Sequence, residues 1–158
     1  MLTKILLIVD PQNDFITGSL AVEGAKEKMM KLSKYIRSVE HPQYDYICVT
    51  MDSHPEDHCS FKENGGIWPK HCVLYSNGWD NPEYLDELLL GELPVIYYHK
   101  GTESNKEEYS IFDNTEDGQV LINQISEFID KGSVSVDICG IAGDYCVLET
   151  LKGLTEII

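Results

Sequence analysis

The sequence has little positive charge and no long apolar run. Its 158 residues include 12 Lys and Arg against 27 Asp and Glu, and the formal net charge is -15. This balance disfavours nucleic acid and anionic membrane surfaces as partners, because both repel an acidic protein. The apolar run near the start covers residues 5–9 and ends at Asp10. It is too short for the core of an export signal or for a membrane span.

The sequence also lacks a CxxC pair, internal repeats, low-complexity tracts and linkers. The five cysteines are odd in number and do not suit a closed disulfide framework, so we expect reduced thiols and a cytoplasmic protein. A chain of 158 residues is long enough to bury about 70% of the surface of its unfolded state. We therefore predict one domain over residues 1–158.

Short apolar runs alternate with amphipathic stretches along the chain. The runs are rich in β-branched and aromatic residues and predict strands at 5–9, 46–50, 95–99 and 136–141. The amphipathic stretches predict helices at 24–39, 82–90 and 118–131. This alternation predicts an α/β fold with a mainly parallel sheet and helices on both faces. Residues 52–81 form one long irregular segment, which in a compact domain is more often functional than idle.

Polar residues follow each predicted strand. In open α/β sheets the carboxyl ends of the strands form the edge that binds ligands. A single Asp or Lys there is usually a cap or a turn residue. Agreement across all the strands instead indicates a functional site, and its members are Asp10, Asp52, His54, Lys100 and Cys146.

Asp52 and His54 suit a metal ion. They lie two residues apart in an extended segment, so their side chains point the same way and can share one ion. His71 and also His58 could complete the ligand set from the following loop. Two cysteines beside these histidines are alternative ligands, because a thiolate binds zinc well: Cys59 and Cys72. Two further histidines match no motif and are interpreted as structural: His41 and His99.

Cys146 has the sequence context of a nucleophile. It follows a strand and begins a predicted helix, where the helix dipole lowers a thiol pKa. Backbone N–H groups of the same turn could hold an oxyanion. Cys48 and Cys139 lie inside predicted strands and are interpreted as small buried apolar residues.

Several motifs together resemble the cysteine hydrolases of the isochorismatase-like superfamily, and within it the nicotinamidases. They are Val-Asp-Pro-Gln-Asn-Asp-Phe at 9–15, Asp-x-His at 52–54, Trp-Pro-x-His-Cys at 68–72, Lys-Gly at 100–101 and Gly-Ile-Ala-x-Asp-x-Cys at 140–146. The resemblance covers residues 5 to about 150, nearly the whole chain. It implies a Rossmann-like, three-layer fold and hydrolysis of nicotinamide to nicotinate and ammonia.

The resemblance also implies roles for particular residues. The catalytic triad would be Asp10, Lys100 and Cys146, and the backbone N–H groups of Ala142 and Cys146 would hold the oxyanion. A peptide bond entering Gly143 would be cis. The metal would be zinc, with iron or manganese as alternatives, and would bind the pyridine ring through ligands Asp52, His54 and His71, with His58 as a possible fourth. Three aromatic residues would surround the ring: Phe15, Trp68 and Tyr109.

Two alternative functions remain open, and the end of the chain departs from the family pattern. The chain could be another amidase of the superfamily that acts on a carbamoyl substrate, or a truncated, weakly active or inactive metal-binding relative. Relatives continue into a further strand and helix, whereas this sequence ends at Ile158, so we expect an open sheet edge. We therefore predict a homo-oligomer whose contact lies near residues 146–158. One apolar helical stripe would build it, from Leu148, Leu151, Leu154 and Ile157.

Overall fold

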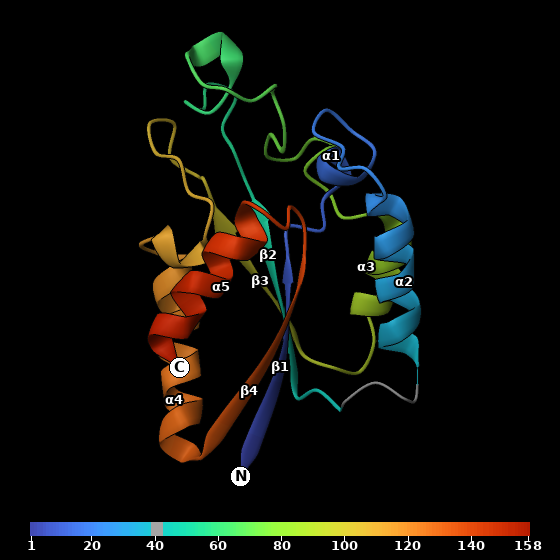
Figure 1. Ribbon diagram of the computed structural model, residues 1–158, viewed down its shortest axis with the longest axis vertical. Helices are drawn as coiled ribbons and strands as arrows, with labels where there is room; N and C mark the ends of the chain where they lie inside the picture. Colours follow the sequence, from blue (N-terminus) through green and yellow to red (C-terminus); the bar gives the residue numbers. More distant parts are fainter. Residues whose placement is uncertain (39–42) are drawn as a thin grey trace.

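The computed structural model describes residues 1–38 and 43–158, and its centre is a four-stranded parallel sheet (Figure 1). The strands are β1 (Leu2–Val9), β2 (Tyr46–Asp52), β3 (Val95–Lys100) and β4 (Ser133–Gly140). Their order across the sheet is β3-β2-β1-β4, and every neighbouring pair is parallel. The carboxyl ends of all four strands therefore meet at one edge.

Helices cover both faces of the sheet. Helices α2 (Ala25–Arg37) and α3 (Glu83–Leu89) lie on one side, and α4 (Asp117–Lys131) and α5 (Cys146–Ile157) lie on the other (Figure 1). Shorter turns are α1 (Asn13–Ile16), η1 (Lys62–Asn64) and η2 (Ile111–Asp113). The predicted α/β architecture with three layers is confirmed.

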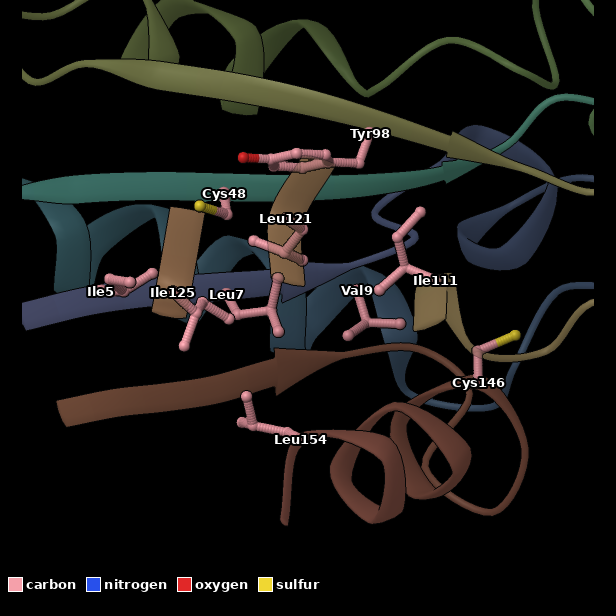
Figure 2. Packing of buried hydrophobic residues seen from close by; sticks show 10 residues of the cluster. All are labelled: Ile5, Leu7, Val9, Cys48, Tyr98, Ile111, Leu121, Ile125, Cys146 and Leu154. Carbon is pink, nitrogen blue, oxygen red and sulfur yellow. The ribbon is translucent and has the colours of Figure 1, made fainter. Parts of the chain in front are cut away.

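The strand β1 shows why the sheet needs helices on both sides. Its apolar residues alternate between the two faces, and each face meets a separate core cluster. Leu7 packs with Leu121 of α4 and Leu154 of α5 (Figure 2), whereas Leu6 belongs to the cluster that contains Leu85 of α3. These side chains are at most 5% exposed. An uninterrupted apolar run is therefore the correct signal for a strand that is buried on both faces.

The predicted boundaries are close, except at the starts of β1 and β4. The strand β1 is predicted from residue 5 but begins at Leu2. For β4 the prediction begins at residue 136, but the strand begins at Ser133 and ends at Gly140. This strand lies at the sheet edge, and its outward residues include Ser135 and Asp137, which break the apolar run that marks a buried strand. The helix predicted at 24–39 is observed as Ala25–Arg37, and residue 39 and His41 lie outside the described residues.

The segment between β2 and α3 is irregular, as predicted, and it is fixed to the sheet edge. Isolated bridges join His54 to Val73 and Phe61 to Trp68. The side chain of Asp14 accepts a hydrogen bond from the backbone of Cys72 at 2.7 Å. These contacts hold the loop over the end of β2.

The expected apolar stripe on α5 is wrong. Leu154 is 5% exposed and Ile157 packs against the core, whereas Leu148 and Leu151 are 38% and 41% exposed. A spacing of three residues does not match the helical repeat of 3.6, so successive side chains drift around the helix.

Among the described residues, we find no helix that combines the length and the hydropathy needed to span a bilayer.

Candidate active site

Four predicted site residues converge where the strands end. Asp10 follows β1, Asp52 ends β2, Lys100 ends β3, and Cys146 begins α5 just after β4. Asp10 and Lys100 are 0% exposed, and Asp52 and Cys146 are 4% and 6% exposed. Carboxylate oxygens of Asp10 and Asp52 and the Cys146 sulfur all lie within 4.8 Å of one another. The sheet thus gathers residues that are far apart in the sequence.

Lys100 connects the members of this cluster. Its Nζ lies 2.8 Å from Oδ2 of Asp10 and 3.6 Å from the sulfur of Cys146, and it also pairs with Oδ1 of Asp52. Burial alone would lower the pKa of Lys100, but Asp10 and Asp52 outweigh it and raise the pKa well above its ordinary value. Lys100 is therefore a permanent cation at the floor of the site.

Asp10 is held in a defined position. Its Oδ1 accepts a hydrogen bond from the Thr50 hydroxyl at 2.8 Å, and its backbone N–H donates to the Thr50 carbonyl at 3.0 Å. Burial raises the pKa of Asp10, although Lys100 opposes that shift. A carboxylate oxygen of Asp10 lies within 4.8 Å of the Cys146 sulfur. Asp10 can therefore exchange a proton with this sulfur.

The expected low pKa of Cys146 is not found. Burial raises the pKa of Cys146 well above its ordinary value, and nearby Asp10 and Asp52 raise it further. Lys100 opposes the shift, but its charge is shared with two carboxylates. Position at a helix N-terminus does not reveal how deeply a thiol is buried, which is why the sequence misleads here. The resting thiol is protonated and needs a base.

Asp52, His54 and His71 form a group that fits a metal ion. Oδ2 of Asp52 lies 3.5 Å from Nε2 of His54 and 3.8 Å from Nε2 of His71. Nδ1 of His54 donates to the Gly101 carbonyl at 2.8 Å, and Nδ1 of His71 donates to the Pro69 carbonyl at 2.7 Å. In the neutral rings these bonds place the proton on Nδ1 and leave Nε2 as the ligand atom. Among the described residues, the buried Nε2 of His54 has no hydrogen-bond partner, which suits a metal-ligating atom.

The charges of this group also suit an ion. Although burial raises the pKa of Asp52, Lys100 and His54 lower it more, so the carboxylate is ionised. Burial lowers the pKa of His71 and favours its neutral, ligating form. Burial also lowers the pKa of His54, but Asp52 raises it above the ordinary value. A bound cation would replace the proton that Asp52 stabilises on His54.

Glycine is required beside His54. Gly101 has φ +62°, and a Cβ at this position would lie 2.4 Å from Cε1 of the His54 ring. Its N–H donates to the buried carboxylate of Glu108 at 2.7 Å, and Glu108 also accepts from Asn114 at 3.0 Å. The carbonyl that orients His54 is therefore itself fixed by a buried network.

His58 lies beside the metal group but not in it. Its Nδ1 lies 2.8 Å from the Ser60 hydroxyl, and its Nε2 donates to the Lys106 carbonyl at 2.9 Å. The His58 and His54 rings stack with centroids 3.9 Å apart. Burial, followed by the charge of His54, lowers the pKa of His58 to about 4. The predicted alternatives Cys59 and Cys72 also lie outside the group.

A cavity of about 250 Å³ opens above the cluster and reaches both Cys146 and His71. The three predicted aromatic residues line it. Nε1 of Trp68 donates to the Tyr109 hydroxyl at 3.2 Å, while Phe15 lies against His71 with ring centroids 5.7 Å apart. Phe15 is also 6% exposed and part of a core cluster, so it serves both packing and the cavity wall.

Gln12 supports the site and was not predicted from the sequence. Its Nε2 donates to the carbonyls of Asp52 and Trp79 at 2.7 and 3.0 Å, and its Oε1 accepts from the Asp52 N–H at 2.9 Å. Gln12 thus clamps the backbone of a metal-group residue. Its position inside the motif at 9–15 was the available signal.

Other residues of the cavity wall were also not predicted, among them Tyr145 and Glu107. The Tyr145 ring contacts Trp68 edge-on, with centroids 5.1 Å apart, and lies 5.7 Å from Tyr109. Tyr145 directly precedes Cys146, which was a usable signal. Glu107 sits in a loop and carries no motif.

The turn before α5 places backbone donors at the cavity. Ala142 and Cys146 both line it, and the Ala142 carbonyl accepts from the N–H groups of Tyr145 and Val147. The N–H of Cys146 lies in the first turn of α5 and so has no acceptor within its own helix. The expected cis peptide bond before Gly143 is instead between Ile141 and Ala142, one bond earlier.

Comparison with known proteins agrees with this arrangement. No family model matches the sequence. The nicotinamidase/pyrazinamidase of Mycobacterium tuberculosis is 36% identical over 154 residues, which cover 94% of this chain and 77% of that protein. The structure of PnC1 from L. infantum in complex with nicotinate has a TM-score of 0.83 at 30% identity, covering 98% and 75% of the two chains. Pyrazinamidase of Pyrococcus horikoshii in complex with zinc has a TM-score of 0.73 at 35% identity, covering 96% and 78%.

Proposed function

This chain belongs to the nicotinamidase family of isochorismatase-like amide hydrolases, and we propose that it converts nicotinamide and water to nicotinate and ammonia. The observation that carries the proposal is one cavity that contacts both halves of the site. Its floor reaches the Cys146 thiol with Asp10 and Lys100 behind it, and its wall reaches Asp52 and His71. A flat aromatic amide bound in this cavity could contact the Cys146 thiol and the side chains of Asp52 and His71 at the same time.

The first step is attack by Cys146. Because the thiol is protonated at rest, Asp10 accepts its proton as the sulfur bonds to the amide carbon. The carbonyl oxygen then carries negative charge, and the N–H groups of Ala142 and Cys146 donate to it. The positive charge of Lys100 offsets the negative charge that develops in the site during this attack.

The second step releases ammonia and then the acid. The C–N bond breaks as Asp10 returns its proton to the leaving nitrogen, which leaves a thioester on Cys146. Asp10 next accepts a proton from water, whose oxygen attacks the thioester carbon. The C–S bond breaks, the sulfur regains the proton from Asp10, and the released nicotinic acid loses its proton to solvent as nicotinate. The raised pKa of Asp10 suits a group that must both accept and donate a proton.

The metal would be a divalent transition ion held by Asp52, His54 and His71. When bound, it supplies a Lewis acid that can hold the pyridine nitrogen and so orient the ring. Zinc is our first assignment, and iron and manganese suit the same two imidazoles and one carboxylate. Phe15 and Trp68 would flank the ring, with Tyr109 near the mouth.

An amide panel tests the proposal. Metal-loaded protein should release ammonia from nicotinamide far faster than from carbamoyl and ureido compounds. Preference for a carbamoyl compound would assign a different amidase, and no release from any amide would indicate an inactive relative. The five free cysteines support a further proposal, that the protein works in a reducing, cytoplasmic setting.

A further inference from the structure

The mouth of the cavity carries charge of one sign. Its charged lining residues are Asp52, which is buried, and Glu107 and Asp144, which are exposed. Along the described chain, no Lys or Arg lines this cavity. An entering molecule therefore passes two carboxylates and no fixed cation.

The nearest lysines do not compensate for these carboxylates. Lys100 is fully buried and paired with Asp10 and Asp52. Lys106 directly precedes Glu107 in the chain, but its Nζ lies 2.9 Å from Glu108 and donates to the Asp113 carbonyl at 2.8 Å. Lys106 thus neutralises Glu108 rather than Glu107, which lines the cavity.

Glu107 is electrostatically coupled to the floor of the site. Its Oε1 accepts a hydrogen bond from the Glu108 N–H at 3.2 Å, which restrains the carboxyl group. Partial desolvation raises the pKa of Glu107, and the charge of Asp52 raises it further. The charges of His54 and Lys100 oppose this shift. Because Glu107 lines the cavity, its carboxylate would repel a negative charge placed there.

We infer that Glu107, assisted by Asp144, is a specificity-determining residue that favours neutral aromatic amides and weakens the retention of carboxylates. The inference rests on the proposed function, in which a neutral amide becomes an anion. Repulsion from the mouth leaves the substrate unaffected and acts on the product, so it opposes product inhibition. Amides that carry a carboxylate of their own are disfavoured for the same reason.

The test compares how tightly the enzyme holds the anion and the neutral amide. The ratio of the inhibition constant of nicotinate to the KM of nicotinamide is measured at pH 8, well above the ordinary glutamate pKa of about 4.3. Glu107→Gln should lower this ratio about two- to fivefold at low salt, and Glu107→Lys should lower it further. About 0.5 M salt should shrink both differences, because it screens exposed charges. Glu103→Gln is the matched control, since Glu103 is an exposed acid of the same loop that does not line the cavity.

Equal ratios in wild type, Glu107→Gln and Glu107→Lys would overturn the inference, as would an equal change in Glu103→Gln. Calorimetric binding of nicotinate and nicotinamide to the Cys146→Ala variant gives the same comparison without turnover. If nicotinamide is hydrolysed but the ratio does not change, only the inference about Glu107 fails. If the wild type releases no ammonia and Cys146→Ala binds neither ligand, the proposed function and the inference fail together.

Discussion

The two halves of the site are held in place by different means. Asp10, Lys100 and Cys146 stand at the ends of strands or the start of a helix, so the sheet itself sets their spacing. His54 and His71 lie in the irregular segment after β2, and hydrogen bonds to the carbonyls of Gly101 and Pro69 orient their rings. The catalytic half is therefore a property of the fold, whereas the metal half depends on local contacts. Mutations can therefore impair one half of the site and leave the other intact.

The largest expected effect is on turnover. Cys146→Ala should reduce nicotinamide hydrolysis by about 10⁴-fold or more, because the nucleophile is lost. Bound metal should remain stoichiometric, since the sulfur is not in the group of Asp52, His54 and His71. Ammonia release and elemental analysis of the same sample measure both. Near-normal turnover, or loss of metal with the thiol, would show that the halves are not separable in this way.

The second effect falls on the metal half. His54→Ala and His71→Ala should each weaken metal affinity by more than about 100-fold and raise the KM strongly, because one of three protein ligands is removed. His58→Ala is the neighbouring comparison and should cost less, because both nitrogens of His58 face protein groups. Metal affinity is measured by competition with a chelator. An equal loss in His58→Ala would make His58 a ligand.

A smaller effect tests whether local contacts orient the metal half. Gly101→Ala should weaken metal affinity about tenfold or more and lower stability, because its Cβ would press on the His54 ring. Gly24→Ala is the matched control for Gly101→Ala, since Gly24 also has a positive φ (+76°) but has open space around an added Cβ. It should cost about 1 kcal/mol of stability and leave metal affinity unchanged. If the two variants behave alike, backbone strain rather than the contact with His54 is responsible.

The smallest effect concerns a surface remote from the chemistry. We predict a homo-oligomer that buries Leu148 and Leu151, the exposed apolar residues of α5. Light scattering at low micromolar concentration should give a mass above that of one chain, and Leu151→Gln should reduce it. Leu90→Gln, at an exposed position at the end of α3, is the control. A monodisperse monomer that hydrolyses nicotinamide would remove this prediction and leave both halves of the site intact.

The same contrast explains what the sequence could predict. Asp10, Asp52, Lys100 and Cys146 could be grouped because the ends of parallel strands must meet at one edge. Glu107 could not, since nothing local in its loop points to the cavity. The raised pKa of Cys146 was also out of reach, because burial depends on how distant elements pack. Site geometry can be predicted from this sequence where the sheet sets it, and least where tertiary contacts set it.

Hydroxylamine trapping tests the covalent route through Cys146 most directly. A thioester on Cys146 should partition between water and hydroxylamine, so nicotinohydroxamate should form during turnover of nicotinamide, and its share should rise with hydroxylamine concentration. Cys146→Ala should form neither nicotinate nor nicotinohydroxamate. If the wild type makes nicotinate but no hydroxamate at any hydroxylamine concentration, water attacks the amide directly and the proposed role of Cys146 is wrong.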